Sequence, residues 1–284
     1  MTTSDYILLL TCPDRPGIVH DVSGFIVERD GNILDSAQFG DPATNLFCMR
    51  IHFAVPGTQS AEDLRQAFAG IAERYGMDWQ IHDRSVRPRV LILVSKFDHC
   101  LIDLLYRRRI GELGIEVPAV ISNHRDAYKL VAAEDIPFFH FPTTPGTKDT
   151  QEQQIREIID RERIDFVVLA RYMQILSAGF CNDFAGRVIN IHHSFLPGFK
   201  GARPYHQAHG RGVKLIGATA HYATADLDEG PIIEQDVSRV SHAQTAEELA
   251  AVGRDIETRV LARAVRYQAE HRVVLNAGKT IVFA

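Results

Sequence analysis

The pattern of hydrophobic and polar positions changes character once along the chain, near residue 85. Before that point, short stretches with strand and helix periodicity alternate. Strands are expected at 6–11, 32–39, 46–55 and 78–81, and helices at 18–29 and 60–75. Ser60, with Asp63 three residues later, is a suitable N-cap for the second helix. This βαββαβ order predicts a ferredoxin-like sandwich.

After residue 89 the strands become short, continuous apolar runs, which are typical of parallel strands covered on both faces. We expect strands at 90–94, 117–121, 166–169 and 188–191, and helices at 101–110, 127–134, 149–163 and 178–184. Two further strands, 214–222 and 232–237, precede a long helix over 246–271. This order predicts an α/β fold with a doubly wound, mostly parallel sheet, whose ligands bind beyond the carboxyl ends of the strands. The expected domains are 1–84 and 90–284, joined by a basic linker at 85–89.

Composition narrows the class of protein without choosing a function. The 284 residues include 31 Lys and Arg against 36 Asp and Glu, a formal net charge of −5, so no general attraction to nucleic acid is expected. No apolar run approaches the ~18 residues that a membrane span requires, and the start of the chain does not resemble a signal peptide. The four cysteines form no CxxC pair. We therefore expect a cytoplasmic protein without a disulfide framework or zinc knot, and without nucleic-acid or membrane partners.

The densest polar cluster follows the buried strand 188–191. Because side chains alternate between the faces of a strand, Asn190 and His192 project to one side and His193 to the other. A polar pair at the carboxyl end of a parallel strand is where α/β enzymes place reactive groups. The alternative is that both are core residues satisfied by the backbone. For His193 a structural role is expected.

A second polar cluster lies between the last two strands of the predicted sheet. It holds three carboxylates, Asp226, Asp228 and Glu229, before a Gly-Pro pair. Such a segment usually forms a solvated turn, but a carboxylate held at the edge of the sheet could instead accept a proton. Spacing alone does not choose among the three. His221, on the preceding strand, either orients the site or is a satisfied core histidine.

These two clusters together resemble a known family. Asn190-x-His192 with Ser194-x-Leu196-Pro197, followed by Leu227-Asp228-x-Gly230-Pro231, is similar to the signature of folate-dependent formyltransferases of the glycinamide ribonucleotide type. The resemblance implies that a triad surrounds the formyl group of 10-formyltetrahydrofolate, and this triad consists of Asn190, His192 and Asp228. Residues 171–176 resemble the segment that lines the pterin in that family. The folate-binding residues expected from this are Met173, Gln174, Ile175 and Leu176, with Thr224 and Leu227 on a closing loop.

The first domain resembles ACT domains, which are small amino-acid-sensing modules, through residues 13–18 and 31–33. An ACT domain before this catalytic domain, together with the stretch 192–208, is the arrangement of formyltetrahydrofolate deformylases. The resemblance implies hydrolysis of 10-formyltetrahydrofolate to formate and tetrahydrofolate, which supplies formate for purine biosynthesis and balances one-carbon pools. It also implies a homo-oligomer formed through ACT domains and an amino-acid effector, with methionine and glycine as candidates. The residues expected to bind the effector are Asp14, Gly17, Ile18, Asn32 and Ile33.

The loop after the first strand of the second domain bears on the choice between hydrolysis and transfer. Glycinamide ribonucleotide formyltransferases have a glycine- and serine-rich loop there, whose amides bind the substrate phosphate. Here residues 95–100 read Ser-Lys-Phe-Asp-His-Cys, without glycine and with a carboxylate, which favours water as the acceptor. Two alternatives stay open, a formyltransferase acting on glycinamide ribonucleotide and an inactive amino-acid-sensing regulator. Neither a cofactor nor a metal is expected, because no HxxxH or similar ligand spacing occurs.

Overall fold

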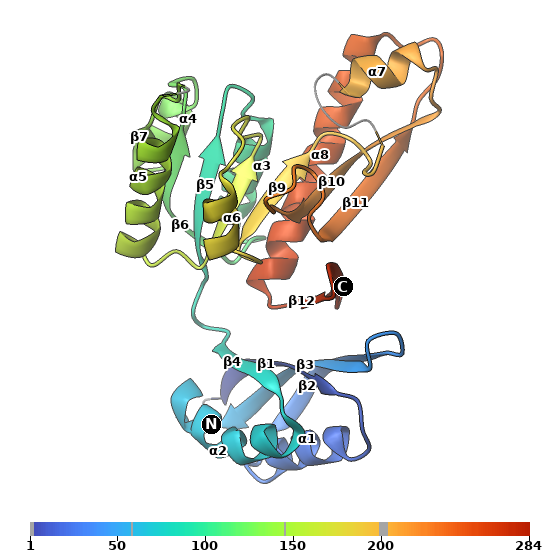
Figure 1. Ribbon diagram of the computed structural model, residues 1–284. Helices are drawn as coiled ribbons and strands as arrows, with labels where there is room; N and C mark the ends of the chain where they lie inside the picture. Colours follow the sequence, from blue (N-terminus) through green and yellow to red (C-terminus); the bar gives the residue numbers. More distant parts are fainter. Residues whose placement is uncertain (1–2, 58, 145, 199–203) are drawn as a thin grey trace. The chain divides into compact units, whose positions relative to one another are not determined.

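The computed structural model describes residues 3–57, 59–144, 146–198 and 204–284 (Figure 1). The chain divides into two compact units. One comprises the residues up to Arg87 with Glu270–Ala277 and Ile281–Ala284, and the other comprises Pro88–Ala269 with Gly278–Thr280. The division therefore falls inside the expected linker, 85–89. The expected extent of the second domain, 90–284, differs from this division, because most of the C-terminal segment packs with the first unit.

The first unit has the predicted βαββαβ order. Its elements are β1 (Thr3–Pro13), α1 (Ile18–Val27), β2 (Asn32–Asp41), β3 (Leu46–Pro56), α2 (Ala61–Tyr75) and β4 (Asp78–Asp83). They form an antiparallel sheet of order β2-β3-β1-β4, so β2 and β4 are its edges. Ser60 caps α2 through the expected capping box with Asp63. The ferredoxin-like fold is confirmed.

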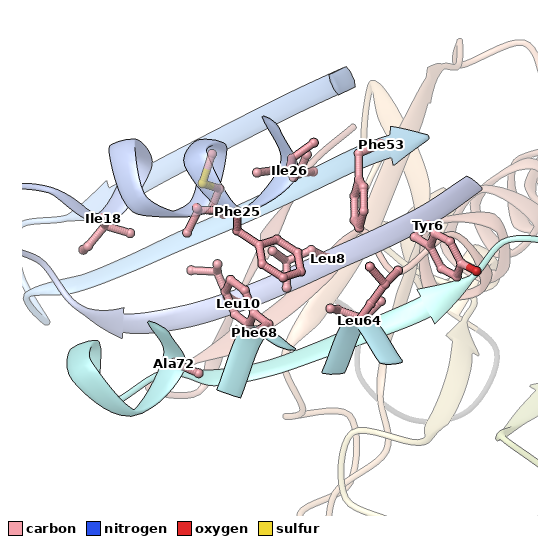
Figure 2. Packing of buried hydrophobic residues seen from close by; sticks show 14 of the residues in the cluster. Tyr6, Leu8, Leu10, Ile18, Phe25, Ile26, Phe53, Leu64, Phe68 and Ala72 are labelled. Carbon is pink, nitrogen blue, oxygen red and sulfur yellow. The ribbon is translucent and has the colours of Figure 1, made fainter. Parts of the chain in front are cut away.

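The core of the first unit lies between its sheet and the two helices. Leu8 and Leu10 of β1 and Phe53 of β3 belong to one buried cluster with Phe25 of α1 and Phe68 of α2 (Figure 2). The Phe25 and Phe68 rings meet edge to face, with centroids 5.0 Å apart. Such burial contributes roughly 1.5–3 kcal/mol for each large apolar side chain. Hydrophobic packing therefore holds both helices on one face of the sheet.

The other face of this sheet carries a hairpin from the end of the chain, which sequence analysis missed. The hairpin consists of β12 (Val273–Asn276) and β13 (Lys279–Val282). Val274 and Phe283 pack against Cys48 of β3. The Arg50 guanidinium donates two hydrogen bonds to the carbonyl oxygen of Glu270. Sheet residues from near the start of the chain thus hold its last residues.

The second unit contains a seven-stranded sheet of order β11-β10-β9-β8-β5-β6-β7. Its strands are β5 (Arg89–Val94), β6 (Glu116–Ser122), β7 (Phe138–His140), β8 (Phe166–Ala170), β9 (Val188–His192), β10 (Leu215–Tyr222) and β11 (Ile232–Arg239). Strands β5 to β9 are parallel, whereas β10 is antiparallel to both β9 and β11. The expected doubly wound, mostly parallel sheet is confirmed. The strand order reverses at β5 and β8, so the switch point lies beyond their carboxyl ends.

Helices cover both faces of this sheet (Figure 1). They are α3 (His99–Arg109), α4 (Tyr128–Ala132), α5 (Lys148–Arg161), α6 (Ala178–Asp183), α7 (Pro204–Gly210) and α8 (Ala246–Ala269). Helices α5 and α6 share a buried cluster with β5, β6 and β8. Helix α8 contacts β9, β10 and β11, and also α3 and α7. Sequence analysis had not placed β7 or α7, and no helix among the described residues is long and apolar enough to span a bilayer.

Candidate active site

Strand β9 carries the first polar cluster into the interior of the second unit. Its neighbours β8 and β10 cover both edges of the strand, and Asn190 lies directly opposite His221 of β10. His192 is the last residue of the strand and is only 4% exposed. Because side chains alternate, Asn190 and His192 face the same side, as expected. A buried polar pair is thus held rigidly at the carboxyl end of a central strand.

The loop between β10 and β11 brings one carboxylate to this pair. The Asp228 Oδ1 atom lies 3.1 Å from Nδ1 of His192, whereas Asp226 and Glu229 are exposed. Asp228 has a φ of 58°, a left-handed conformation that Asp adopts more readily than most residues. Gly230 allows the loop to close, since a Cβ there would lie 1.7 Å from the carbonyl oxygen of Tyr222. The fold therefore selects Asp228 from three carboxylates that spacing could not separate.

The charge of Asp228 is stabilised by imidazole rings. Burial by itself would raise the pKa of this carboxyl, but the hydrogen bond from His192 and the electrostatic interaction with that ring outweigh it and leave the pKa lowered. At neutral pH the side chain is consequently a carboxylate. As a carboxylate it accepts the Nδ1–H of His192.

His221 is fixed in one tautomer by its neighbours. Its Nδ1 lies 2.9 Å from the carbonyl oxygen of Tyr222, which can only accept, so Nδ1 carries the proton. Burial lowers the pKa of His221, so the ring is neutral and its Nε2 accepts. The Nδ2 group of Asn190, 3.1 Å away, therefore donates one of its hydrogens to His221. This contact sets the orientation of the Asn190 carboxamide.

Two polar groups of the site are left for a ligand. Among the described residues, no hydrogen-bond partner contacts the buried Nε2 of His192. The Asn190 amide has a second N–H beyond the one that it donates to His221. A carbonyl oxygen between these two groups would receive two donors whenever His192 is protonated. The arrangement can thus stabilise an oxyanion beside a carboxylate–imidazole pair.

The segment expected to bind folate is a loop between β8 and α6, anchored at both ends. The Met173 amide donates to Ser95 Oγ at 2.9 Å, and the Ser177 amide donates to the Glu152 carboxylate at 2.7 Å. Between these anchors Met173 and Ile175 are 52% and 62% exposed, and Gln174 is intermediate. Leu176 instead packs against the buried cluster that β5, β6 and β8 share with α5 and α6. Leu176 therefore anchors the loop to the core, and Met173 and Ile175 form the exposed surface of the loop.

The second folate-binding segment is the loop that contains Asp228. Thr224 is exposed, and its hydroxyl donates to the carbonyl oxygen of Asp226 at 2.9 Å. Leu227 is 56% exposed. An exposed apolar side chain next to a buried catalytic candidate is typical of a ligand-binding surface.

The residues expected to bind an effector lie in the first unit. Gly17 is the residue before α1, with a φ of 96°, and no side chain caps that helix. Asp14 and Asn32 are exposed and Ile33 is 37% exposed. Ile18 is buried in the core, so its side chain is not accessible to a ligand.

Sequence analysis missed a second, largely buried cluster in the second unit. It consists of His99 at the start of α3, Arg171 directly after β8, Tyr205 on α7 and Glu257 on α8. The signal was present for Glu257, because it lies with Gly253, Ile256, Val260 and Leu261 at the helical spacing of a buried face. Residues 199–203, within the stretch 192–208 that carries the resemblance, lie outside the described residues.

Comparisons with known proteins agree with this architecture. The family model described as formyl transferase matches residues 88–265, and the ACT domain model matches 6–71. A relative named formyltetrahydrofolate deformylase from Synechocystis sp. is 48% identical over 278 residues, covering 98% of each chain.

Solved structures agree as well. A structure described as formyltetrahydrofolate deformylase from Burkholderia mallei is 49% identical with a TM-score of 0.95, covering 99% of this chain and 100% of that one. A glycinamide ribonucleotide transformylase from Symbiobacterium toebii is 30% identical with a TM-score of 0.65, covering 70% of this chain and 95% of that one. The chain therefore belongs to the formyltetrahydrofolate deformylases.

Proposed function

We propose that the chain hydrolyses 10-formyltetrahydrofolate to formate and tetrahydrofolate at Asn190, His192 and Asp228. The observation that carries these roles is the 3.1 Å contact between His192 and Asp228, with the opposite imidazole nitrogen left open. Relatives that match nearly the whole chain are named deformylases, whereas the transformylase structure covers 70% of it. This favours hydrolysis over transfer to glycinamide ribonucleotide. The assembled triad disfavours an inactive regulator.

The oxyanion that forms when water attacks the formyl carbon is stabilised by two donors. One is the second N–H of Asn190, and the other is Nε2–H of protonated His192. Each donor of this kind contributes about 3 kcal/mol to the stability of the transition state. His221 acts through Asn190, because its acceptor nitrogen holds the carboxamide in place.

The protons of the attacking water pass to the Asp228–His192 pair. The new C–O bond forms as the pair takes a proton, and the C–N10 bond then breaks as N10 receives one. Formate, tetrahydrofolate and one released proton balance the reaction.

Folate is held by the two loops beside the triad. Backbone groups of 173–176, including those of Gln174, bind the pterin, and Met173 and Ile175 supply an apolar wall. Thr224 and Leu227 cover the other side. These loops are largely exposed, whereas His192 is buried and Asn190 and Asp228 are only partly exposed, so the formyl group would enter deeply and the pterin would stay near the surface.

The proposed chemistry needs neither metal nor cofactor, because each step uses a side chain of the triad. The one group of metal-ligating side chains found among the described residues is His99, Cys100 and Glu257. The Glu257 carboxylate in it already receives the Tyr205 hydroxyl. The test is release of formate from 10-formyltetrahydrofolate without added acceptor and with a chelator present. Formate and tetrahydrofolate should appear in equal amounts, and dependence on glycinamide ribonucleotide or on metal would contradict the proposal.

The first unit is proposed to join copies of the chain and to bind an amino-acid effector. Edge strand β2 exposes Ile33, Leu34 and Phe39, with exposed fractions of 37%, 48% and 46%. Pairing of two such edges would cover these side chains. The effector carboxylate would bind the uncapped amides at Gly17, and Asp14 or Asn32 would bind its ammonium group.

The effector proposal is tested by calorimetric titration of the full chain with methionine, glycine and the other common amino acids. The full chain is needed because the C-terminal hairpin completes the first unit. We expect one amino acid to bind and to change the rate of deformylation. If none binds and the kinetics are unchanged, the unit serves assembly only.

Four free, buried cysteines support a cytoplasmic location.

A further inference from the structure

A buried network of charged and polar groups lies at the carboxyl ends of β5 and β8. Glu257, 1% exposed, accepts a hydrogen bond from the Tyr205 hydroxyl at 2.7 Å, and its other oxygen lies 2.8 Å from His99 Nε2. The Nε atom of Arg171 is 3.4 Å from that same oxygen. Although burial opposes ionisation of Glu257, His99, Arg171 and Tyr205 together lower its pKa. The network is therefore built around a buried carboxylate.

This network occupies the switch point of the sheet. His99 begins the helix that follows β5, and Arg171 is the first residue after β8. In doubly wound sheets the crevice at this point is where ligands bind. Here the crevice holds side chains of the protein itself, including Phe97, whose ring faces the Arg171 guanidinium at 5.7 Å.

The network also adjoins the triad. The His193 ring centroid lies 5.2 Å from that of His192 and 6.2 Å from that of Tyr205. Burial, reinforced by the Arg171 charge, lowers the pKa of His193 to about 3, so this ring stays neutral between them. Through His193 the network is therefore continuous with the triad at the end of β9.

Two backbone features accommodate the network. Arg171 has a φ of 62°, a left-handed conformation that disfavours side chains with a Cβ. Tyr205 lies against Gly253 of α8, where a Cβ would be 2.1 Å from the Tyr205 Cζ atom. Strained residues and buried charges commonly persist where function requires them.

We propose that Arg171, Glu257, Tyr205 and His99 form a plug that keeps nitrogen nucleophiles from the formyl carbon and leaves water as the acceptor. The proposal rests on the proposed roles of the triad. With water, a C–O bond replaces C–N10 and formate is released. With a primary amine, a C–N bond would form, N10 would take the amine's proton, and an N-formyl amine would replace formate. The triad serves both reactions, and the plug determines which nucleophile reaches the carbon.

The test compares Arg171→Gly with Arg163→Gly. Both arginines have a positive φ, 62° and 50°, so glycine suits both positions, but Arg163 is exposed and precedes β8. Each full-length variant is given 10-formyltetrahydrofolate and glycinamide, a small primary amine, and formate, formylglycinamide and tetrahydrofolate are measured. The wild type and Arg163→Gly should form one formate for each tetrahydrofolate. In Arg171→Gly, formylglycinamide should replace about a tenth or more of the formate.

Tyr205→Ala opens the same network from α7 and decides the matter if Arg171→Gly does not fold, as judged by circular dichroism. Equal formate and tetrahydrofolate in the folded variants, with glycinamide present, overturns the proposal. Complete loss of turnover in folded variants also overturns it, because a plug that only excludes amines is not needed for attack by water. Failure of the triad roles would be seen separately, as hydrolysis that survives Asp228→Asn.

Discussion

Strands β9 and β2 depart from the usual burial pattern in opposite directions. In β9 the whole strand is buried or nearly so, although it contains Asn190 and His192. In β2 almost every residue is exposed, although Leu34 and Phe39 are among them. Buried polar groups cost free energy unless they are paired, and exposed apolar groups form sites at which other molecules bind.

The difference separates two kinds of function. The polar groups of β9 are paired within one chain, by Asp228 and His221, and the atoms left over point to a reacting group. The apolar groups of β2 lie on an edge strand that pairs with β3 on one side. The first pattern fits the proposed chemistry inside a subunit, and the second fits the proposed association between subunits.

The largest effect is expected at Asp228, the carboxylate that contacts His192 of β9. Asp228→Asn preserves volume but removes proton acceptance, so turnover should fall at least ~100-fold while folate still binds. Turnover should fall by comparable factors in His192→Ala and Asn190→Ala, because each change removes a donor to the oxyanion. Asp226→Asn is the matched control and should be mild, because Asp226 is exposed. Collapse of activity in Asp226→Asn with near-normal activity in Asp228→Asn would mean that the wrong carboxylate has been assigned.

Most of this architecture could be predicted because local pattern and tertiary structure agree. Continuous apolar runs correctly indicated β5, β6, β8 and β9, and the Ser60 capping box correctly marked the start of α2. The hairpin β12–β13 was missed, although Ala277-Gly278 between two short apolar runs is a turn signal. Its packing on Cys48 connects residues far apart in sequence, which no local pattern reports.

Part of the candidate site could also be predicted from the local pattern of residues. Alternation placed Asn190 and His192 on one face, but the choice among three carboxylates depended on a loop conformation closed by Gly230. The exposure of Ile175 and the burial of Leu176 likewise depend on the anchors of their loop rather than on residue type. Sequence patterns therefore placed Asn190 and His192 on one face of a strand, and tertiary contacts bring His221 and Asp228 to them.

The next largest effect is expected at the exposed edge. Phe39→Lys places a charge on β2, so pairing of two edges should weaken at least about tenfold. Val27→Lys is the matched control, because Val27 is 68% exposed on α1 of the same unit. Light scattering across a dilution series measures the dissociation. If Phe39→Lys and Val27→Lys associate equally well, β2 is not the interface.

A smaller effect is expected at the loop of residues 173–176, which lies between β8 and α6. Ile175→Asp should raise the folate KM about fivefold with little change in unfolding temperature, because an exposed apolar contact is lost. Ile102→Asp is the control, since Ile102 is exposed on α3. An unchanged KM in the folded Ile175 variant would remove this loop from the folate site.

The smallest effect is a pH dependence of stability in the first unit. The His271 ring stacks on His82 with centroids 3.4 Å apart, and burial, His82 and Arg50 together lower the pKa of His271 to about 3. In the unfolded chain this histidine titrates near 6.5, so the unfolded state binds more protons as pH falls below that value. Stability should therefore decrease by about 0.8 kcal/mol between pH 7.5 and pH 6.

Urea unfolding of the wild type and of His271→Asn at both pH values measures this contribution. Asparagine suits the positive φ of 52° at position 271. The loss on acidification should shrink by about 0.8 kcal/mol in His271→Asn. An equal loss in the two proteins would show that His271 is protonated alike in the folded and unfolded states.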